Sequence, residues 1–255
     1  ALFPCRSGVG ARAEAKFAPG ANRIYRASYD DGGTLASWDA RDLRLLSCNH
    51  VELADGADVT CVTPLRGTAF TLAGDALGNV SVLRVGFDAQ SQTTQAKVCP
   101  GYRITAQEAL HRVVDTSRAR MRVVAIEQQP GLINECSRVL IAWADGSMAV
   151  WHLHERRSVA VTAPATKSDV GNADDAASED DGGATLTTTT CATWLDANTF
   201  ASGRSDGSVV AHSVPELMGC TVTHEITRAQ DLIWPYKIID SSYSGTALMG
   251  IRALR

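Results

Sequence analysis

A glycine in a short polar turn recurs four times in this chain, and a strand-like position follows each glycine five residues later. The four copies run from Gly33 to Trp38, from Gly78 to Leu83, from Gly146 to Trp151 and from Gly207 to His212. Each turn opens into alternating small and β-branched residues, a pattern typical of hairpins in an antiparallel sheet. The recurrence predicts a repeat architecture, because a supersecondary unit copied at intervals buries its apolar faces by stacking on its neighbours.

Two further strand-like segments precede each turn. The nearer segments are predicted at 23–28, 68–73, 138–143 and 198–202, and the farther ones at 14–17, 59–62, 122–126 and 190–194. Three consecutive strands joined by turns make a β-meander, and a repeated meander is the sequence signature of a β-propeller. The spacing from Gly33 to Gly78 matches the period of about 40–45 residues of WD40 repeats, and the longer spacings that follow require insertions. We therefore predict an all-β, WD40-type β-propeller with four recognisable blades, which form a partial arc of a seven-bladed ring.

The predicted propeller segment covers residues 13–255. Its blades are expected at approximately 13–48, 58–85, 121–160 and 186–214, and 221–253 is either a degenerate fifth blade or the start of a truncated one. Residues 1–12 are expected to be irregular, and the chain is expected to be a fragment of a longer protein. The acidic insertion at 163–184 is expected to be a disordered loop, because it has too little apolar surface to offset the entropy lost on ordering. The stretch 106–114 is expected to form a short helix or to lead into an outer strand.

The bulk composition is that of an ordinary soluble globular domain, with 45% hydrophobic and 20% charged residues. The balance of 24 Lys and Arg against 28 Asp and Glu lacks the basic footprint of a nucleic-acid-binding protein. No apolar run approaches the roughly 20 residues that a transmembrane helix needs. Seven cysteines without a Cys-x-x-Cys pair favour free thiols in a reducing compartment. We expect a cytoplasmic protein without a cofactor.

One pentapeptide, Gly203-Arg204-Ser205-Asp206-Gly207, matches the nucleophile elbow of hydrolases. An elbow needs a helix after its serine, whereas Ser208-Val209-Val210 continues as a strand. The pentapeptide is also one copy of the repeated turn. We therefore predict no catalytic residue, and a hydrolase that uses Ser205 is the enzymatic alternative.

Two histidines, His152 and His154, flank Leu153 on a predicted strand and so point to the same face. With a third ligand they could bind a metal. No Cys, Asp or Glu at ligand spacing accompanies them, so we expect solvent-facing histidines at a blade edge and no metal site.

The residues that define the repeat are interpreted as structural markers rather than as binding residues. They are Gly33, Trp38, Asp39, Gly78, Leu83, Gly146, Trp151, Gly207 and His212. Only Trp38-Asp39 keeps the Trp-Asp dipeptide for which WD40 repeats are named, so the repeats are degenerate. Large aromatics on the strands are expected to pack within and between blades.

The middle of the chain carries, in order, Pro100-Gly101-Tyr102, Val123-Val124-Ala125-Ile126, Gln129-Pro130 and the run RVLIAWADGSMAVWHL at 138–153. This order resembles the N-terminal propeller of the lethal giant larvae and tomosyn family. Residues 59–85, with Gly74-Asp75 and Gly78-Asn79-Val80, resemble the family's preceding blade. Residues 190–214, with Ser205-Asp206-Gly207, resemble the following one.

The resemblance implies a non-catalytic scaffold of two seven-bladed propellers. Such a scaffold binds plasma-membrane syntaxin-type SNAREs and Rab GTPases, regulates exocytosis, and is peripheral at the plasma membrane. No binding residue of the family can be carried over to this sequence. The alternative is a generic WD40 adaptor or substrate-receptor platform in a multisubunit complex.

Overall fold

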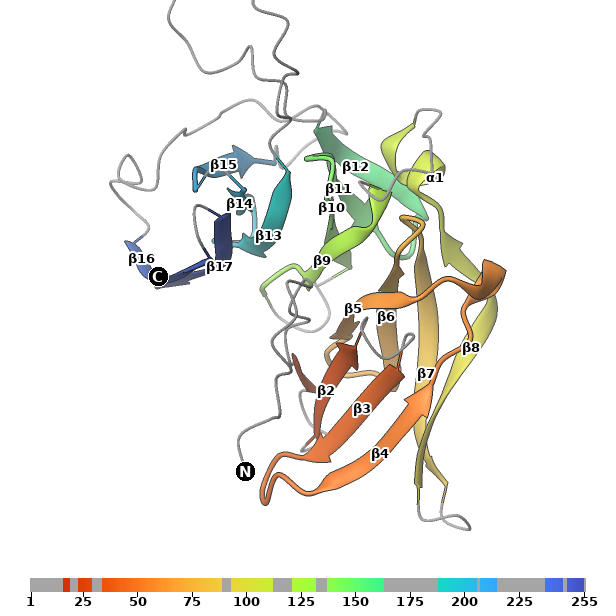
Figure 1. The fold of residues 1–255 in the computed structure, drawn as a ribbon. Helices are drawn as coiled ribbons and strands as arrows, with labels where there is room; N and C mark the ends of the chain where they lie inside the picture. Colours follow the sequence, from red (N-terminus) through yellow and green to blue (C-terminus); the bar gives the residue numbers. More distant parts are fainter. Residues whose placement is uncertain are drawn as a thin grey trace, which may run out of the picture.

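The computed structural model of this chain describes residues 16–18, 23–28, 34–88, 93–111, 121–131, 137–162, 188–205, 207–214, 237–244 and 247–254. Within these ranges the chain is almost entirely β-strand, and it forms five antiparallel sheets that follow one another in sequence and in space (Figure 1). This arrangement confirms the predicted all-β class. We call the sheets blades 1 to 5 in chain order.

The strands of each blade pair in the order in which they occur in the chain. Blade 1 contains β1 (Lys16–Ala18), β2 (Arg23–Ser28), β3 (Thr34–Asp39) and β4 (Leu45–His50), and blade 2 contains β5 (Val59–Pro64), β6 (Phe70–Asp75), β7 (Val80–Asp88) and β8 (Thr93–Ile104). Blade 3 contains β9 (Val123–Gln128), β10 (Arg138–Trp143), β11 (Met148–His152) and β12 (Arg157–Thr162). Blade 4 contains β13 (Thr189–Trp194), β14 (Thr199–Arg204) and β15 (Val209–Ser213), and blade 5 contains β16 (Lys237–Ser244) and β17 (Ala247–Leu254). Sequential antiparallel pairing is the meander that the repeat predicts.

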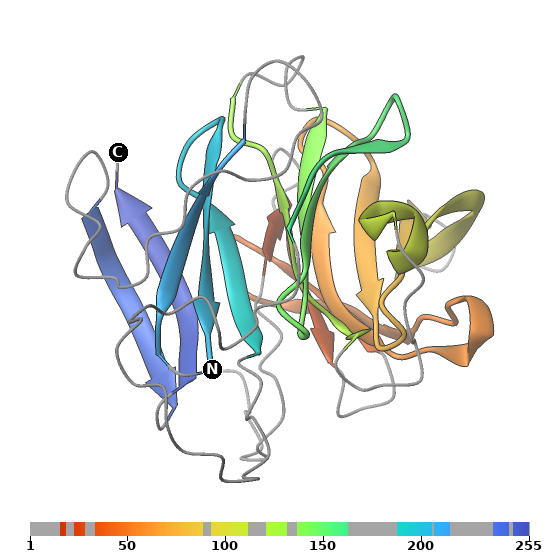
Figure 2. The same cartoon turned by 90° about the horizontal axis from the view of Figure 1, so that it is seen from above.

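The blades stand side by side in an arc. β5 lies beside β2 and β9, β9 lies beside β13, and β13 lies beside β17. Figure 2 shows the sheets from above, with their faces turned toward one another. The first strand of each of blades 1 to 4 thus lies beside the sheet of the next blade.

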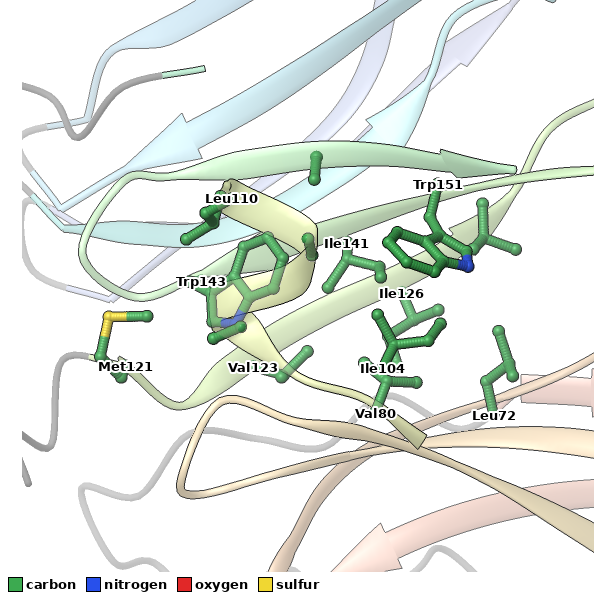
Figure 3. Packing of buried hydrophobic residues seen from close by; sticks show 14 residues of the cluster. Leu72, Val80, Ile104, Leu110, Met121, Val123, Ile126, Ile141, Trp143 and Trp151 are labelled. Atoms are coloured by element: carbon green, nitrogen blue, oxygen red, sulfur yellow. The ribbon is translucent and has the colours of Figure 1, made fainter. Parts of the chain in front are cut away.

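Apolar side chains fill the space between successive blades. Representative members are Tyr25, Leu35, Val62 and Leu83 between blades 1 and 2; Leu72, Val80, Ile126 and Trp151 between blades 2 and 3 (Figure 3); and Leu140, Val150, Trp194 and Phe200 between blades 3 and 4. Successive residues of a strand point to opposite faces of a sheet. A blade with neighbours on both sides therefore buries nearly every residue of its middle strands, as β10 does from Val139 to Trp143.

In blades 2 to 4 the turn between the second and third strands carries the marker glycine. Gly78, Gly146 and Gly207 have φ angles of +91°, +94° and +84°, whereas Gly33 lies outside the described residues. At Gly78 a side chain is excluded for a second reason, because a Cβ atom there would lie 2.5 Å from the carbonyl oxygen of Met121. The glycine thus permits both the turn and close contact between blades 2 and 3.

β8 is the largest difference from the sequence expectation. The second blade is expected to end near residue 85, but β7 continues to Asp88 and β8 adds a fourth strand that ends at Ile104. β8 pairs with β7 through an irregular register between Ser81 and Leu83. It also lies beside β4 of blade 1.

A short helix, α1 (Ala106–Leu110), follows β8. Of the two alternatives for 106–114, the described residues adopt the helix. Thr105 and Glu108 form a capping box at its start, which satisfies two backbone N–H groups. α1 packs against β12, and the hydroxyl of Ser158 donates a hydrogen bond of 2.6 Å to the carbonyl oxygen of Ala109.

Several sequence expectations concern residues outside the described ranges, namely the irregular segment 1–12, the acidic loop 163–184 and residues 221–236. Within the stretch 221–253, β16 and β17 pair as a hairpin. β17 lies beside β13 and β14, so the hairpin continues the arc after blade 4.

Candidate interaction surface

In blades 2 to 4 the marker residues of the third strands lie at positions that face the preceding blade. Leu83 and Trp151 are buried there and belong to the apolar clusters with blades 1 and 2, respectively. Trp38 is half-buried. His212 takes the same position in blade 4, where its buried ring stacks on that of Phe200 with centroids 4.9 Å apart.

Burial, together with a smaller effect of the positive charge of Arg204, lowers the pKa of His212 to about 3. Among the residues that the structure describes, neither ring nitrogen of His212 has a hydrogen-bond partner. The ring is therefore neutral at neutral pH and serves as a packing side chain, in a position that Leu83 and Trp151 fill with apolar groups.

Asp39 ends β3 and holds the turn that leads to β4. Its carboxylate accepts hydrogen bonds from the Arg41 guanidinium at 2.8 and 3.1 Å and from the Arg41 backbone N–H at 2.9 Å. These hydrogen bonds hold the pKa of Asp39 well below its usual range. The Asp of the Trp-Asp dipeptide thus has a local structural partner.

The inner strands bring two opposite charges together from distant parts of the chain. Lys16 of β1 forms an ion pair with Glu127 of β9, so blade 1 reaches blade 3 past the first strand of blade 2. Cys61 lies on that strand, and burial raises the pKa of its thiol to about 12. A thiol with such a pKa stays protonated and is a poor nucleophile.

Ser205 lies in the turn between β14 and β15 and not at the start of a helix. Its hydroxyl oxygen accepts a hydrogen bond of 3.0 Å from the backbone N–H of Thr188, and its own N–H donates one of 2.8 Å to the Thr188 carbonyl. The strand–turn–helix geometry of a nucleophile elbow is therefore absent at this serine.

The ring centroids of His152 and His154 are 6.3 Å apart. The Nδ1 atom of His152 accepts a hydrogen bond from the Glu155 backbone N–H, and its Nε2 atom lies 3.1 Å from the Ser137 hydroxyl. Both nitrogens of His152 are thus engaged locally. Across the part of the chain that the structure describes, no group of three His, Cys, Asp or Glu side chains is placed to hold a metal ion.

The loops between the first and second strands connect three blades on one side of the arc. The Arg66 guanidinium of blade 2 donates hydrogen bonds to the carbonyl oxygens of Gln129 and Gly131 in blade 3. The side-chain amide of Gln129 in turn donates to the carbonyl oxygen of Ala197 in blade 4. Charged and amide donors that satisfy loop carbonyls stabilise the relative positions of the blades.

An exposed row of side chains crosses blade 2 near the loops that join the first and second strands. Phe70, Arg84 and Lys97 lie directly opposite one another on β6, β7 and β8. Directly opposed residues of an antiparallel sheet share a face. Farther along, Leu72 and Val80 on this face pack against blade 3, but Phe70 is 40% exposed and both cations are exposed.

A second aromatic lies farther along β8 on the same face as Ile104. Tyr102 is 61% exposed, and the guanidinium carbon of Arg156, from the turn between β11 and β12, lies 5.8 Å from the centroid of its ring. A nitrogen of that guanidinium lies 3.4 Å from the Gly101 carbonyl oxygen. We call the five residues Phe70, Arg84, Lys97, Tyr102 and Arg156 the rim strip.

Sequence reasoning did not single out the rim strip as a site. Alternation along β7 indicates that Arg84 and Leu83 face opposite sides, but only the pairing register shows that Lys97 is opposite Arg84. That register runs without interruption from the Asp88–Thr93 pair to the Arg84–Lys97 pair, and the irregularity of the ladder lies beyond it, between Ser81 and Leu83.

Comparisons with solved structures identify the fold. The chain is similar to the structure of U3-55K, with 13% identity and a TM-score of 0.50, over 89% of this chain and 57% of that chain. It is similar to the RRP9 WD40 repeats, with 12% identity, a TM-score of 0.50 and the same coverage. It is also similar to Chaetomium thermophilum Raptor, with 14% identity and a TM-score of 0.52, over 85% of this chain and 17% of that chain. The fold is a WD40-type β-propeller.

The chain spans 57% of the length of the U3-55K and RRP9 chains that it matches. A scan against protein-family models finds no match, and a search of curated proteins finds no significant relative. The described part of the chain contains no helix of the length and apolar character required to span a membrane.

Proposed function

We propose that this chain is a non-catalytic protein-interaction scaffold. One contrast supports the proposal: Ser205 holds a turn and His152 is engaged by local hydrogen bonds, whereas the rim strip exposes aromatic and arginine side chains. Tyr and Arg are enriched among the residues that dominate binding energy at protein interfaces. The blades supply a rigid frame on which such side chains are held in place.

We further propose that the scaffold regulates vesicle exocytosis by binding syntaxin-type SNAREs. This proposal rests on the resemblance of residues 59–85, 100–153 and 190–214 to the lethal giant larvae and tomosyn propeller. It includes a cytoplasmic location with peripheral attachment at the plasma membrane, Rab GTPases as further partners, and a seven-bladed ring to which these blades belong.

The test uses the full-length protein that contains this chain. Tagged protein is passed over immobilised syntaxin-type SNARE helices, with an unrelated coiled coil of similar charge as the control, and partners that co-purify from extract are identified by mass spectrometry. We expect retention on the SNARE helices and recovery of SNAREs. Stoichiometric recovery of another multisubunit complex without SNAREs would replace the exocytic role by that of an adaptor. Hydrolase activity that is lost in Ser205→Ala would contradict a non-catalytic role.

A further inference from the structure

The charges and aromatic rings of the rim strip point to a class of partner. We propose that the strip binds an extended acidic protein segment that also carries aromatic or aliphatic side chains. The inference rests on the proposed scaffold function and specifies what one surface of the scaffold binds.

Blade 2 carries two exposed cations on neighbouring strands. Arg84 and Lys97 are directly opposite each other on neighbouring strands, and like charges in this position repel and destabilise a sheet. Some other cations of the described chain are paired with carboxylates, such as Arg103 with Asp55 and Arg157 with Glu155. No described carboxylate forms an ion pair with Arg84 or Lys97. A carboxylate from a partner would relieve the repulsion between them.

Two exposed aromatic rings belong to the rim strip. Phe70 lies in the same cross-strand row as the two cations, and Tyr102 lies farther along β8. Arg156 stacks over Tyr102, and the nearby carboxylate of Glu155 is engaged by Arg157 at 2.6 Å. Arg156 therefore offers a third cation that is held in place by an aromatic ring. Rings at separate points of the strip suit apolar side chains spaced along an extended segment.

The charge of the rim strip and of the whole chain fits a protein segment better than other polyanions. Three cations are fewer than the clusters of about 4–8 Lys or Arg that are typical of anionic-lipid recognition. The whole chain has a net charge of −4, which opposes the electrostatic attraction that dominates binding to nucleic acid. Exposed Phe and Tyr beside a few cations fit a peptide in which carboxylates and apolar side chains alternate.

The experiment measures fluorescence anisotropy of a short fluorescein-labelled peptide in which glutamate alternates with leucine and phenylalanine. A peptide with lysine in place of glutamate is the charge control. We expect the full chain to bind the acidic peptide and not the basic one. We expect Arg84→Glu to weaken binding roughly tenfold or more, as truncation or reversal of a central interface charge does. Arg84→Lys keeps the charge and should retain most of the affinity.

Arg44→Glu is the matched control, because it makes the same charge change at an exposed cation on blade 1. It should leave the affinity unchanged, and circular dichroism should show the same fold in all variants. Absence of binding by the unaltered chain, or equal losses in Arg84→Glu and Arg44→Glu, would overturn the proposal. Tighter binding to phosphatidylserine vesicles or to single-stranded DNA than to the peptide would also overturn it. If the strip fails in this assay while the full-length protein still recovers partners from extract, the scaffold function stands and only the strip is refuted.

Discussion

Gly78 combines two constraints that can be separated by experiment. Its φ of +91° is costly for a residue with a Cβ atom, and that atom would approach Met121 of blade 3. Gly101 has a similar φ of +80°, but nothing lies within 4 Å of a Cβ atom there. The two glycines therefore separate the cost of backbone conformation from the cost of the inter-blade contact.

We predict that Gly78→Ala lowers the free energy of unfolding by about 3 kcal/mol or more, because backbone strain and a steric clash of roughly 1–3 kcal/mol each add. Gly101→Ala should lower the free energy of unfolding by about 1 kcal/mol, because it adds backbone strain without a steric clash. Urea unfolding of both variants measures the difference. Equal costs would mean that Gly78 is required by its turn alone and that blades 2 and 3 do not approach each other there.

Trp143 and Trp151 form a second matched pair. Both are buried in the cluster between blades 2 and 3 (Figure 3). Of these two side chains, within the described residues only the indole N–H of Trp143 donates a hydrogen bond, to the carbonyl oxygen of Gly78 at 2.8 Å. Phenylalanine at either position keeps an aromatic ring and removes the indole nitrogen.

Trp143→Phe should therefore destabilise the protein by about 1–3 kcal/mol more than Trp151→Phe, because it leaves a buried carbonyl oxygen without its donor. Thermal and urea unfolding of the two variants would show the difference. A larger loss in Trp151→Phe would indicate that ring size, and not the hydrogen bond, dominates this interface.

At the scale of elements, β15 brings an ionisable group into an apolar interface. The pKa of His212 is about 3 in the folded chain, against an ordinary value of 6.5. Between these two pH values the unfolded chain binds a proton at this histidine that the folded chain does not. The free energy of unfolding therefore keeps the full contribution of His212 above about pH 6.5 and falls as the pH is lowered. The slope from this one residue is about 1.4 kcal/mol per pH unit in that window.

We predict that His212→Phe reduces the loss of stability between pH 7 and pH 5, since phenylalanine keeps the stacking on Phe200 and does not titrate. Urea midpoints at both pH values measure the effect. The same pH dependence in His212→Phe and the unaltered chain would show that His212 is accessible to protons in the fold.

The strands that the sequence predicts best are those with a local signal. β2, β3, β10 and β11 are flanked by polar turns and alternate in polarity or run apolar, and the structure places strands there. β8 has no such signal, because Pro100 and Gly101 interrupt it and its register shifts against β7. For 106–114, propensity alone left helix and strand open, and the choice depends on a capping box and on packing against β12.

At the scale of the whole molecule, the sequence predicts the kind of fold because the repeat is encoded in every blade. The rim strip could not be predicted in the same way. It depends on where blade 3 stops covering blade 2, and this follows from the relative positions of whole sheets. The Lys16–Glu127 ion pair is likewise a consequence of curvature, since it joins residues on strands of blades 1 and 3.

That ion pair provides the most direct test of the arc. A zero-length carbodiimide couples a lysine amine to a carboxylate only when the two groups are in contact, and the linked peptides are identified by mass spectrometry. We predict an amide between Lys16 and Glu127 in the native protein, its loss in Glu127→Gln, and its loss in urea. Recovery of Lys16 coupled only to other carboxylates in the folded protein would contradict the convergence of blades 1 and 3, and with it the propeller geometry described above.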